Sequence, residues 1–366
     1  MEYGAPSPDG LGAHAACISA PLERAVLVVS TDDLTGLPQV EWIFSMLNAF
    51  ILDAGRIVQV RVEDKEDLAR KDLIWVDLAY PSEAERELVQ SVFPLELPED
   101  EELRDLEASA RYYQDQHGVH IRSTFVQTVD EVASIVTMSF SLHQGRLLTV
   151  HDDDLSLLRL FRMQARSGRE IVRDAGDILL GCYELGVERD ADVLEGIYRA
   201  LDEVGGLVLS RKKQITSRGM RENVERIAVH EDLNSKVRLD LIDNRRALSF
   251  LLRSRVLLPE QTQRVKGVLR DIESLNGHTG FIFDKINFLM DALLGMINLE
   301  QNKIIKIFSI AAVVFLPPTL VASIYGMNFE NIPEMKWPLG YPLALLLMVL
   351  AGGAPYLYFR QKGWLD

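Results

Sequence analysis

The residues that invite a chemical explanation stand near the C-terminus, in the stretch YGMNF that runs from Tyr325 to Phe329. Three of them, Gly326, Met327 and Asn328, occupy the point where the chain leaves one apolar segment and turns toward another. Among the three, Asn328 has the hydrogen-bonding side chain, a neutral amide. Many other tripeptides would make a plain turn. The role of these residues depends on whether they lie at a membrane.

Other groups that could carry chemistry give weaker signals. His117 and His120 lie close together in QHGVH, but on a predicted strand this pattern favours solvent-facing side chains over metal ligands. The run HDDD, which starts at His151, could bind a cation or cap the next helix, and we favour capping. The chain has no GxxxxGKS/T loop, no GxGxxG turn and no His-Glu-x-x-His pair. We therefore expect neither an enzyme nor an organic cofactor.

The chain is acidic, and its charge is uneven. The formal net charge of the 366 residues is −15 at pH 7. Residues 301–366 contain five basic and three acidic residues, so the negative charge belongs to the first 300. Nucleic acid prefers a basic face, and we expect no nucleic-acid partner. An acidic soluble part could collect cations or simply favour solubility, and both interpretations stay open.

Two uncharged runs predict membrane spans. Residues 307–329 and 337–359 contain no charged residue, and about 20 apolar residues are enough to cross a bilayer. Basic residues stand outside both runs, namely Lys303, Lys306, Arg360 and Lys362. The connecting loop has one lysine and two glutamates. Because basic residues prefer the cytoplasmic side, both termini should lie in the cytoplasm. The first 25 residues lack the pattern of a secretory signal.

The rest of the chain predicts an α+β cytoplasmic domain followed by long helices and two C-terminal transmembrane helices. Pro259 can stand in the first turn of a helix, where its missing N–H is harmless. No other proline occurs before Pro317, so this helix can be long. The predicted parts are a loosely ordered extension (1–45), a cytoplasmic α/β domain (46–152), a long helical hairpin (153–258), a long pore-lining helix (259–325) with the first span at about 304–325, an external loop (326–340), a second span (341–360) and a cytoplasmic tail (361–366).

Within the predicted α/β domain, local patterns indicate individual elements. FILDAGRIVQV, LIWVDLA and GVHIRSTFVQ are typical of strands, and a hairpin is expected to turn near Gln144 and Gly145. Ser82 and Glu85 have the spacing of a capping box at the start of a helix. Residues 98–113 predict a strongly acidic helix.

With these elements placed, the stretch FLPPTLVASIYGMNFENIPEMKWPLGYP (Phe315 to Pro342) resembles the CorA family of magnesium transport proteins. The hallmark of that family is a Gly-Met-Asn triplet that closes the first of two C-terminal spans. The resemblance continues upstream through EQNKIIKIFS, VRLDLIDNRRALSFL, LRDIES and DLEASARYY, and covers nearly all of the chain from Met46 to Leu365. It is closer to the bacterial CorA proteins than to the zinc-transporting ZntB branch. Such proteins begin near Met46, so residues 1–45 are extra or Met46 is the true start.

The resemblance implies a funnel-shaped homopentamer in the lipid bilayer of the inner membrane that carries Mg²⁺ into the cytoplasm, with Co²⁺ or Ni²⁺ as minor passengers. Five copies of the long helix would line one pore. A stripe of residues three or four apart agrees with this: Asn302, Ile305, Phe308, Ala312, Leu316, Thr319, Ser323 and Gly326. The stripe carries no charge. A lipid-facing or interhelical stripe is the alternative.

An uncharged pore suits magnesium, which keeps several of its waters in most sites. Five Asn328 amides would offer oxygens to the water shell at the mouth, with Gly326 allowing a tight turn and Met327 packing against neighbouring helices. Ile305, Phe308 and Leu316 would form a hydrophobic gate. The acidic ring of the inner vestibule would be supplied by Asp291.

The resemblance also implies regulation by intracellular Mg²⁺, which would bridge acidic residues between subunits and hold the pore shut. Asp271 is our candidate for a residue of this kind. Two other functions stay open: a ZntB-like zinc transporter, and a membrane-anchored cation sensor or scaffold that passes no ions. Selectivity among Mg²⁺, Co²⁺, Ni²⁺ and Zn²⁺ does not follow from the sequence.

Overall fold

The computed structural model describes residues 25–31, 38–44, 46–95, 97–98, 111–129, 132–208, 217–327 and 337–364. The chain divides into two compact units. One contains residues 1–194 and 235–279, and the other contains residues 195–234 and 280–366. The first unit holds the β-sheet, and the second holds both apolar C-terminal segments.

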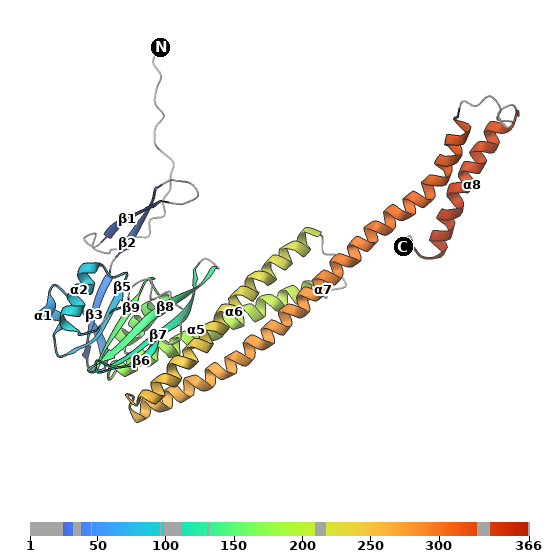
Figure 1. Cartoon of the computed structure of the whole chain (residues 1–366). Helices are drawn as coiled ribbons and strands as arrows, with labels where there is room; N and C mark the ends of the chain where they lie inside the picture. Colours follow the sequence, from blue (N-terminus) through green and yellow to red (C-terminus); the bar gives the residue numbers. More distant parts are fainter. Residues whose placement is uncertain are drawn as a thin grey trace, which may run out of the picture. The chain divides into compact units, whose positions relative to one another are not determined.

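Figure 1 labels the elements along the chain. The strands are β1 (Ala25–Thr31), β2 (Pro38–Phe44), β3 (Met46–Asp53), β4 (Arg56–Val60), β5 (Leu73–Ala79), β6 (Tyr112–Gln114), β7 (Val119–Val129), β8 (Val132–His143) and β9 (Arg146–His151). The helices are α1 (Lys65–Leu68), α2 (Glu83–Val92), α4 (Ser156–Ser167), α5 (Ala175–Val208), α6 (Ser217–Ser254), α7 (Pro259–Tyr325) and α8 (Gly340–Gln361).

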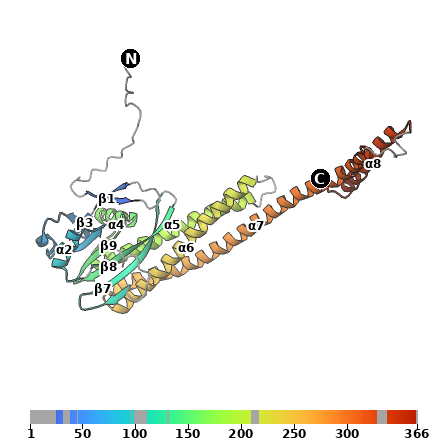
Figure 2. The same ribbon diagram turned by 45° about the horizontal axis from the view of Figure 1, so that its top comes forward.

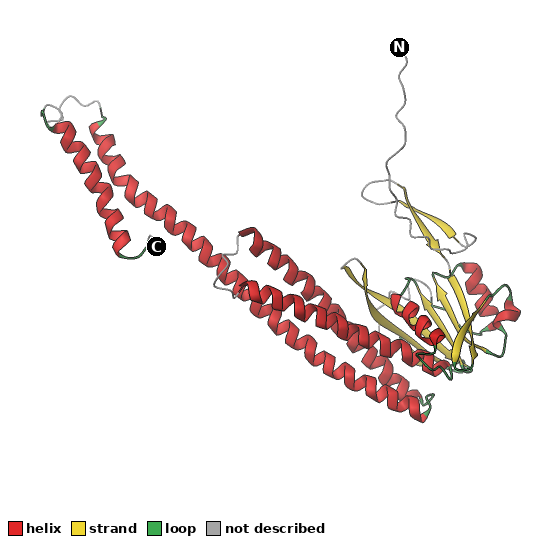
Figure 3. Ribbon diagram, turned by 180° about the vertical axis from the view of Figure 1, so that it is seen from behind, coloured by secondary structure: helices red, strands yellow, loops and turns green. Residues whose placement is uncertain are grey.

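Seven strands form one mixed sheet in the order β4-β3-β5-β9-β8-β7-β6. Only β5 and β9 pair in parallel, with Trp75 opposite Leu147 and Ala79 opposite His151. The other neighbours are antiparallel. Every residue of β5 is buried, as expected for a strand covered on both faces. Figure 3 shows the sheet with α4 lying across one of its faces.

The alternation of side chains along β5 builds the core in two layers. Val76 and Leu78 join a cluster that includes Val89 of α2. On the opposite face, the Trp75 ring meets Phe161 of α4 edge-on, with 5.9 Å between ring centroids. Figure 2 shows α4 and α5 near strands β7 to β9 from a second direction. The sheet is therefore the middle layer of this unit.

Local sequence signals set the turns and caps. Gln144 and Gly145, between β8 and β9, both have positive φ (45° and 79°), which a tight hairpin turn requires. At the start of α2, the Ser82 hydroxyl accepts from the Glu85 amide while the Glu85 carboxylate accepts from the Ser82 amide. The predicted hairpin turn and capping box are both confirmed.

The C-terminal half is helical. α7 extends over 67 residues and continues through Pro317 and Pro318. By length and composition, α7 and α8 are each apolar enough to cross a membrane. The predicted fold class, an α+β soluble part followed by long helices and two apolar C-terminal helices, is confirmed. The domain boundaries proposed from the sequence stay a prediction.

Two expectations need correction. Residues 25–31 and 38–44 pair as antiparallel strands, where we expected a loosely ordered extension. Both segments contain β-branched residues that favour strands, which the composition of 1–45 as a whole concealed. Within the acidic segment 98–113, residues 99–110 lie outside the described part, whereas Tyr112 and Tyr113 belong to strand β6 and not to a helix.

Candidate functional site

The triplet follows directly on the last turn of α7. The Gly326 amide donates to the Ala322 carbonyl at 2.9 Å, and the Met327 amide donates to the Ile324 carbonyl at 3.3 Å. A β-carbon at Gly326 would lie 3.1 Å from the Ala322 carbonyl oxygen, a tight contact that glycine avoids. Asn328, whose amide we expect at the pore mouth, lies outside the described residues.

The predicted pore stripe lies along a single helix. Its eight members, from Asn302 to Gly326, belong to α7 or to the residue directly after it, and all are exposed in the single chain. The side chains of Ile305, Phe308 and Leu316 are 62%, 72% and 65% exposed. Large apolar groups with such exposure need a cover of lipid or protein. Their place in a pore stays a prediction.

The second span covers a different face of α7. A β-carbon added to Gly352 of α8 would lie 3.0 Å from Pro318 Cγ and 3.2 Å from the Val314 carbonyl oxygen. Residues two apart in an α-helix point about 200° away from each other, so Leu316 faces away from this contact. Ile310, one turn before Val314, is buried. The stripe is thus a face that α8 leaves open.

Polar groups interrupt the apolar stripe at Asn302, Thr319 and Ser323. The Thr319 hydroxyl donates to the Phe315 carbonyl at 2.7 Å, which leaves the hydroxyl oxygen free to accept from water. A shallow pocket on this face is lined by Ala312, Phe315, Leu316, Thr319, Leu320 and Ser323. Such a surface can hydrogen-bond water, but it has no charge with which to hold a bare ion.

The two predicted acidic residues on α7 are both exposed. Asp291 lies in the unit that contains the spans. Asp271 lines an open pocket of about 350 Å³ together with Glu184 and Glu188 of α5. Glu184 is paired with Arg264, whereas no ion pair within the described residues holds Glu188 or Asp271. The sequence analysis missed Glu188, which only the packing of α5 on α7 brings to Asp271.

This pocket is not a complete metal site. Within the described residues, no three His, Cys, Asp or Glu side chains lie together so that they could hold a metal ion. Two free carboxylates are too few for a cation that prefers six oxygen ligands. Any divalent ion bound there would need water or groups from outside this chain.

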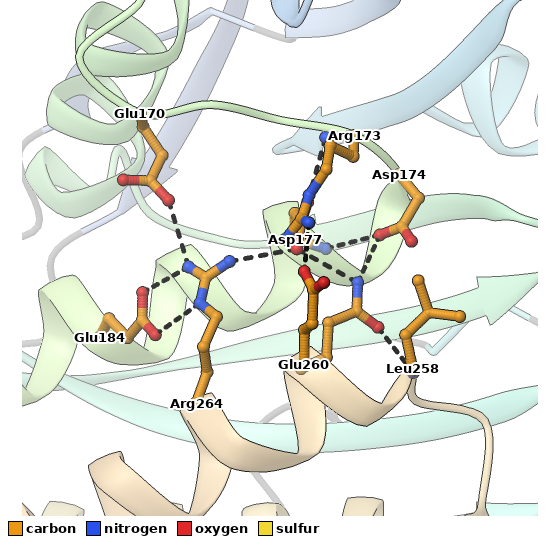
Figure 4. A network of polar contacts seen from close by, with 9 residues as sticks. Glu170, Arg173, Asp174, Asp177, Glu184, Leu258, Glu260 and Arg264 are labelled. Atoms are coloured by element: carbon orange, nitrogen blue, oxygen red, sulfur yellow. Dashed lines mark hydrogen bonds and ion pairs between the residues drawn. The ribbon is translucent and has the colours of Figure 1, made fainter.

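Beside the pocket, a polar clamp ties the first turns of α7 to the start of α5 (Figure 4). The Arg264 guanidinium donates to Glu184 at 2.9 and 2.5 Å, to Asp177 at 3.1 Å and to Glu170 at 3.1 Å. Its side chain is only 24% exposed, and that of Asp177 is fully buried. The three carboxylates raise the pKa of Arg264 above its ordinary value, so the guanidinium stays charged.

Further contacts complete the clamp. The Gln261 side-chain amide donates to Asp174 at 2.7 Å and to Asp177 at 3.1 Å, while its oxygen accepts from the Leu258 amide at 3.1 Å. Arg173 pairs with both Asp177 and Glu260. The spacing of Asp177 and Glu184, seven residues on one helix face, is the sequence signal that could have indicated this site.

The HDDD run does not cap the next helix, contrary to our expectation. The N-cap of α4 is Leu155, and no side chain caps that helix. Instead, His151 Nε2 lies 3.0 Å from Asp77 Oδ1 in the buried sheet layer, and Arg162 donates to Asp77 at 2.9 Å. Burial alone would raise the pKa of Asp77, but His151 and Arg162 outweigh it and hold that pKa below its ordinary value. The local pattern could not predict a partner 74 residues away.

The histidine pair also differs from expectation. His120 is buried and lies 3.0 Å from Ser141 Oγ and 3.3 Å from Asp115, so it does not face solvent. Burial lowers the pKa of His120, and Asp115 opposes that shift. His117 bonds to its neighbour Gln116 at 3.0 Å. Strand β8 supplies the cover that the local pattern did not reveal.

Comparisons with known proteins agree with the resemblance. The family model described as "CorA-like Mg2+ transporter protein" matches residues 70–361. Two proteins named magnesium transport protein CorA match over 321 residues, which is 87% of this chain and all of each relative. They come from Haemophilus ducreyi, at 44% identity, and from Salmonella typhimurium, at 45%.

Solved structures share the fold. The CorA magnesium transporter of Methanocaldococcus jannaschii is 21% identical, with a TM-score of 0.68 over 88% of this chain and 99% of its own. The cytoplasmic domain of ZntB from Vibrio parahaemolyticus is 10% identical, with a TM-score of 0.53 over 70% of this chain and 98% of its own. At such identities, structural likeness shows the fold alone. The family match and the 44–45% identity show more: this chain belongs to the CorA-like Mg²⁺ transporter family.

Proposed function

We propose that the chain assembles as a funnel-shaped homopentamer in the inner membrane and conducts hydrated Mg²⁺ into the cytoplasm. The observation that carries this proposal is the uncharged stripe on α7, which is exposed on a face that α8 does not cover. If five copies turned this stripe inward, large apolar side chains such as Phe308 would gain a common cover. Lysines and arginines outside both spans support cytoplasmic termini.

The proposed passage handles the ion with its water shell. Mg²⁺ dehydrates reluctantly, so neutral acceptors suit it better than carboxylates at contact distance. Asn328 of each subunit would accept from those waters at the mouth, and Thr319 and Asn302 would do so further in. Co²⁺ and Ni²⁺, which are also divalent and hydrated, would be minor passengers.

The apolar positions of the stripe would form the gate. Rings of Ile305, Phe308 and Leu316 can close a pore by excluding water, without any charged plug. In the single chain these side chains have no cover, which fits a surface completed by other copies.

Regulation would involve the pocket that holds Asp271. Its free carboxylate and that of Glu188 would bind intracellular Mg²⁺ together with groups of a neighbouring subunit and hold the pore shut. When Mg²⁺ falls, the carboxylates would repel each other and loosen the assembly. The Asp271→Asn, Glu188→Gln double variant should therefore stay open at high internal Mg²⁺, whereas Glu195→Gln, an exposed carboxylate elsewhere on α5, should not.

Measurements of ion uptake distinguish the proposed magnesium transporter from the two alternative functions. Vesicles that contain the purified protein should take up Mg²⁺ in preference to Zn²⁺. A preference for Zn²⁺ would support a ZntB-like zinc transporter. Binding without uptake of any of Mg²⁺, Co²⁺ or Zn²⁺ would support a cation-sensing scaffold.

The sharpest test of the triplet is Asn328→Ala. It removes the acceptors without adding bulk or charge, so the assembly should survive while Mg²⁺ uptake nearly disappears. Asn331→Ala, in the same loop, is the matched control and should transport normally. Cobalt(III) hexaammine, which imitates hydrated magnesium, should block the parent protein and lose potency against Asn328→Ala. Normal uptake by an assembled Asn328→Ala protein would contradict this role.

The proposed gate can be tested with a variant and a matched control. Leu316 of α7 and Leu350 of α8 are similarly exposed in the single chain, at 65% and 61%. Leu316→Ser should wet the constriction and raise leak at high internal Mg²⁺, whereas Leu350→Ser should not. Equal leak in both variants would mean that the apolar ring only packs.

A further inference from the structure

Two carboxyl groups face each other inside the soluble part, between α5 and α6. Asp190 of α5 is 2% exposed and Asp240 of α6 is 1% exposed. Their carboxyl groups lie within hydrogen-bonding reach of each other. Ionised carboxylates are acceptors only, so a hydrogen bond between the two requires a proton on one of them.

The surroundings do not neutralise this pair. No ion pair within the described residues involves Asp190 or Asp240, and Arg189 acts on Asp190 only at longer range. Asp243, one turn further along α6, is committed elsewhere: it pairs with Arg111 at 3.1 Å and accepts from the Tyr112 hydroxyl at 2.5 Å. A second acidic side chain nearby only makes a double charge at the pair less favourable.

Neutral groups fix the orientation of Asp240. The Asn244 amide donates to Asp240 Oδ2 at 3.2 Å, and the Thr124 hydroxyl of β7, which donates to Asp243, lies close to the same carboxyl. Asp190 Oδ2 and Asp240 Oδ1 are buried and have no donor. Buried acceptors nearly always have a hydrogen-bond donor, so these two oxygens need a hydrogen that the neighbouring side chains do not supply.

We propose that Asp190 and Asp240 form a buried proton-binding site, which shares one proton at neutral pH and makes the packing of α5 on α6 depend on pH. The shared proton lies between the two carboxyls and leaves them with one negative charge. Losing it to solvent would leave two negative charges side by side, away from water, and would break the hydrogen bond between the helices. The inference is independent of the transport mechanism.

The sign of the pH effect follows from the direction of the shifts. Burial raises the pKa of Asp190 to about 7 and raises that of Asp240 well above its ordinary value. In the unfolded chain both groups would titrate near pH 4. The folded protein therefore holds more protons than the unfolded chain between about pH 4 and pH 7. In that window each extra proton makes the unfolding constant rise about tenfold per pH unit, so stability falls as pH rises.

Infrared spectroscopy of the full-length protein in detergent tests the proton directly. We expect the C=O band of protonated carboxyls at pH 6, weakening but not vanishing as pH rises through about 7, and a weaker band in Asp190→Asn, which keeps only the Asp240 carboxyl. Glu195→Gln, an exposed carboxyl on the same helix, should leave the band unchanged. The absence of a band from the parent protein at pH 6, or an unchanged band in Asp190→Asn, would overturn the proposal.

Melting temperatures supply a second readout. Asp190→Asn keeps a donor for Asp240, so it should hold the helices together. Between about pH 4 and pH 7, its unfolding constant should rise with pH less steeply than that of the parent, by a factor of up to tenfold per pH unit. Should Asp190→Asn fail to fold, Asp240→Asn removes the same proton from the other side. If Mg²⁺ or Na⁺ abolishes the band at pH 6 and raises the melting temperature of the parent alone, the oxygens hold a metal cation and the proton site is wrong.

Discussion

Replacing Arg264 with glutamine should loosen the start of α7. Glutamine keeps much of the length and can still donate, but it removes the charge that three carboxylates share. Glu170, Asp177 and Glu184 would then face one another without the cation between them (Figure 4). The first turns of α7 and of α5 should separate more often, while the distant sheet stays closed.

The structure sets the size of this effect. Removing one partner from a buried ion pair costs about 3–5 kcal/mol, chiefly because it leaves a buried charge alone. Here Asp177 keeps Arg173 and Gln261, and the side chains of Glu184 and Glu170 are 33% and 32% exposed and can take up water. We therefore expect about 2–3 kcal/mol, below the full burial value.

Hydrogen exchange measured peptide by peptide can isolate this local opening. For Arg264→Gln in the full-length protein, amides in residues 175–184 and 259–268 should exchange about 30 to 150 times faster. Arg245→Gln is the matched control, because its pair with Glu273 lies at 3.4 Å and both side chains are exposed, so that it contributes under about 1 kcal/mol. If the two variants exchange alike at the start of α7, the clamp does not anchor that helix.

Three more outcomes can be checked. Gly352→Val should lower the melting temperature by about 3–9 °C, because any β-carbon there meets α7, whereas Gly353→Val, with nothing within 4 Å, should have little effect. Ser82→Ala should cost about 1 kcal/mol by chemical denaturation through loss of the capping box, while Ser91→Ala, within the same helix, should cost less than half of that. A chain without residues 1–45 should still assemble and transport, since the family resemblance begins after them; failure to assemble would show that the extension is structural.

Much of the fold follows from local signals in the sequence. LIWVDLA is strand β5 from end to end, and Pro259 opens α7. The 23-residue uncharged runs stand out because few soluble segments avoid charge for so long. The order of the strands, in contrast, does not follow from local signals. The parallel pairing of β5 with β9 joins residues about 70 positions apart, and no local pattern specifies it.

The same distinction between local signals and contacts of distant segments applies to the candidate site. The triplet and the stripe are periodic features of one helix, so the sequence alone could indicate them. Arg264 and Asp177 come together only because α5 packs on α7, and Asp190 meets Asp240 only because α5 packs on α6. A polar residue on an amphipathic helix usually faces solvent, so sequence periodicity is least able to predict buried polar contacts between helices.

The two ends of α7 are held differently, and this bears on how a signal from the soluble unit could reach the proposed pore. At its start, the clamp around Arg264 fixes the helix by several charged contacts. Near its end, Pro317 and Pro318 have no amide hydrogen to donate, so the helical hydrogen bonds to the carbonyls of Val313 and Val314 are missing. Helices bend most readily at such points. We expect a movement imposed at the clamped end to appear as bending there, beside the proposed gate residue Leu316, rather than to dissipate evenly along the helix.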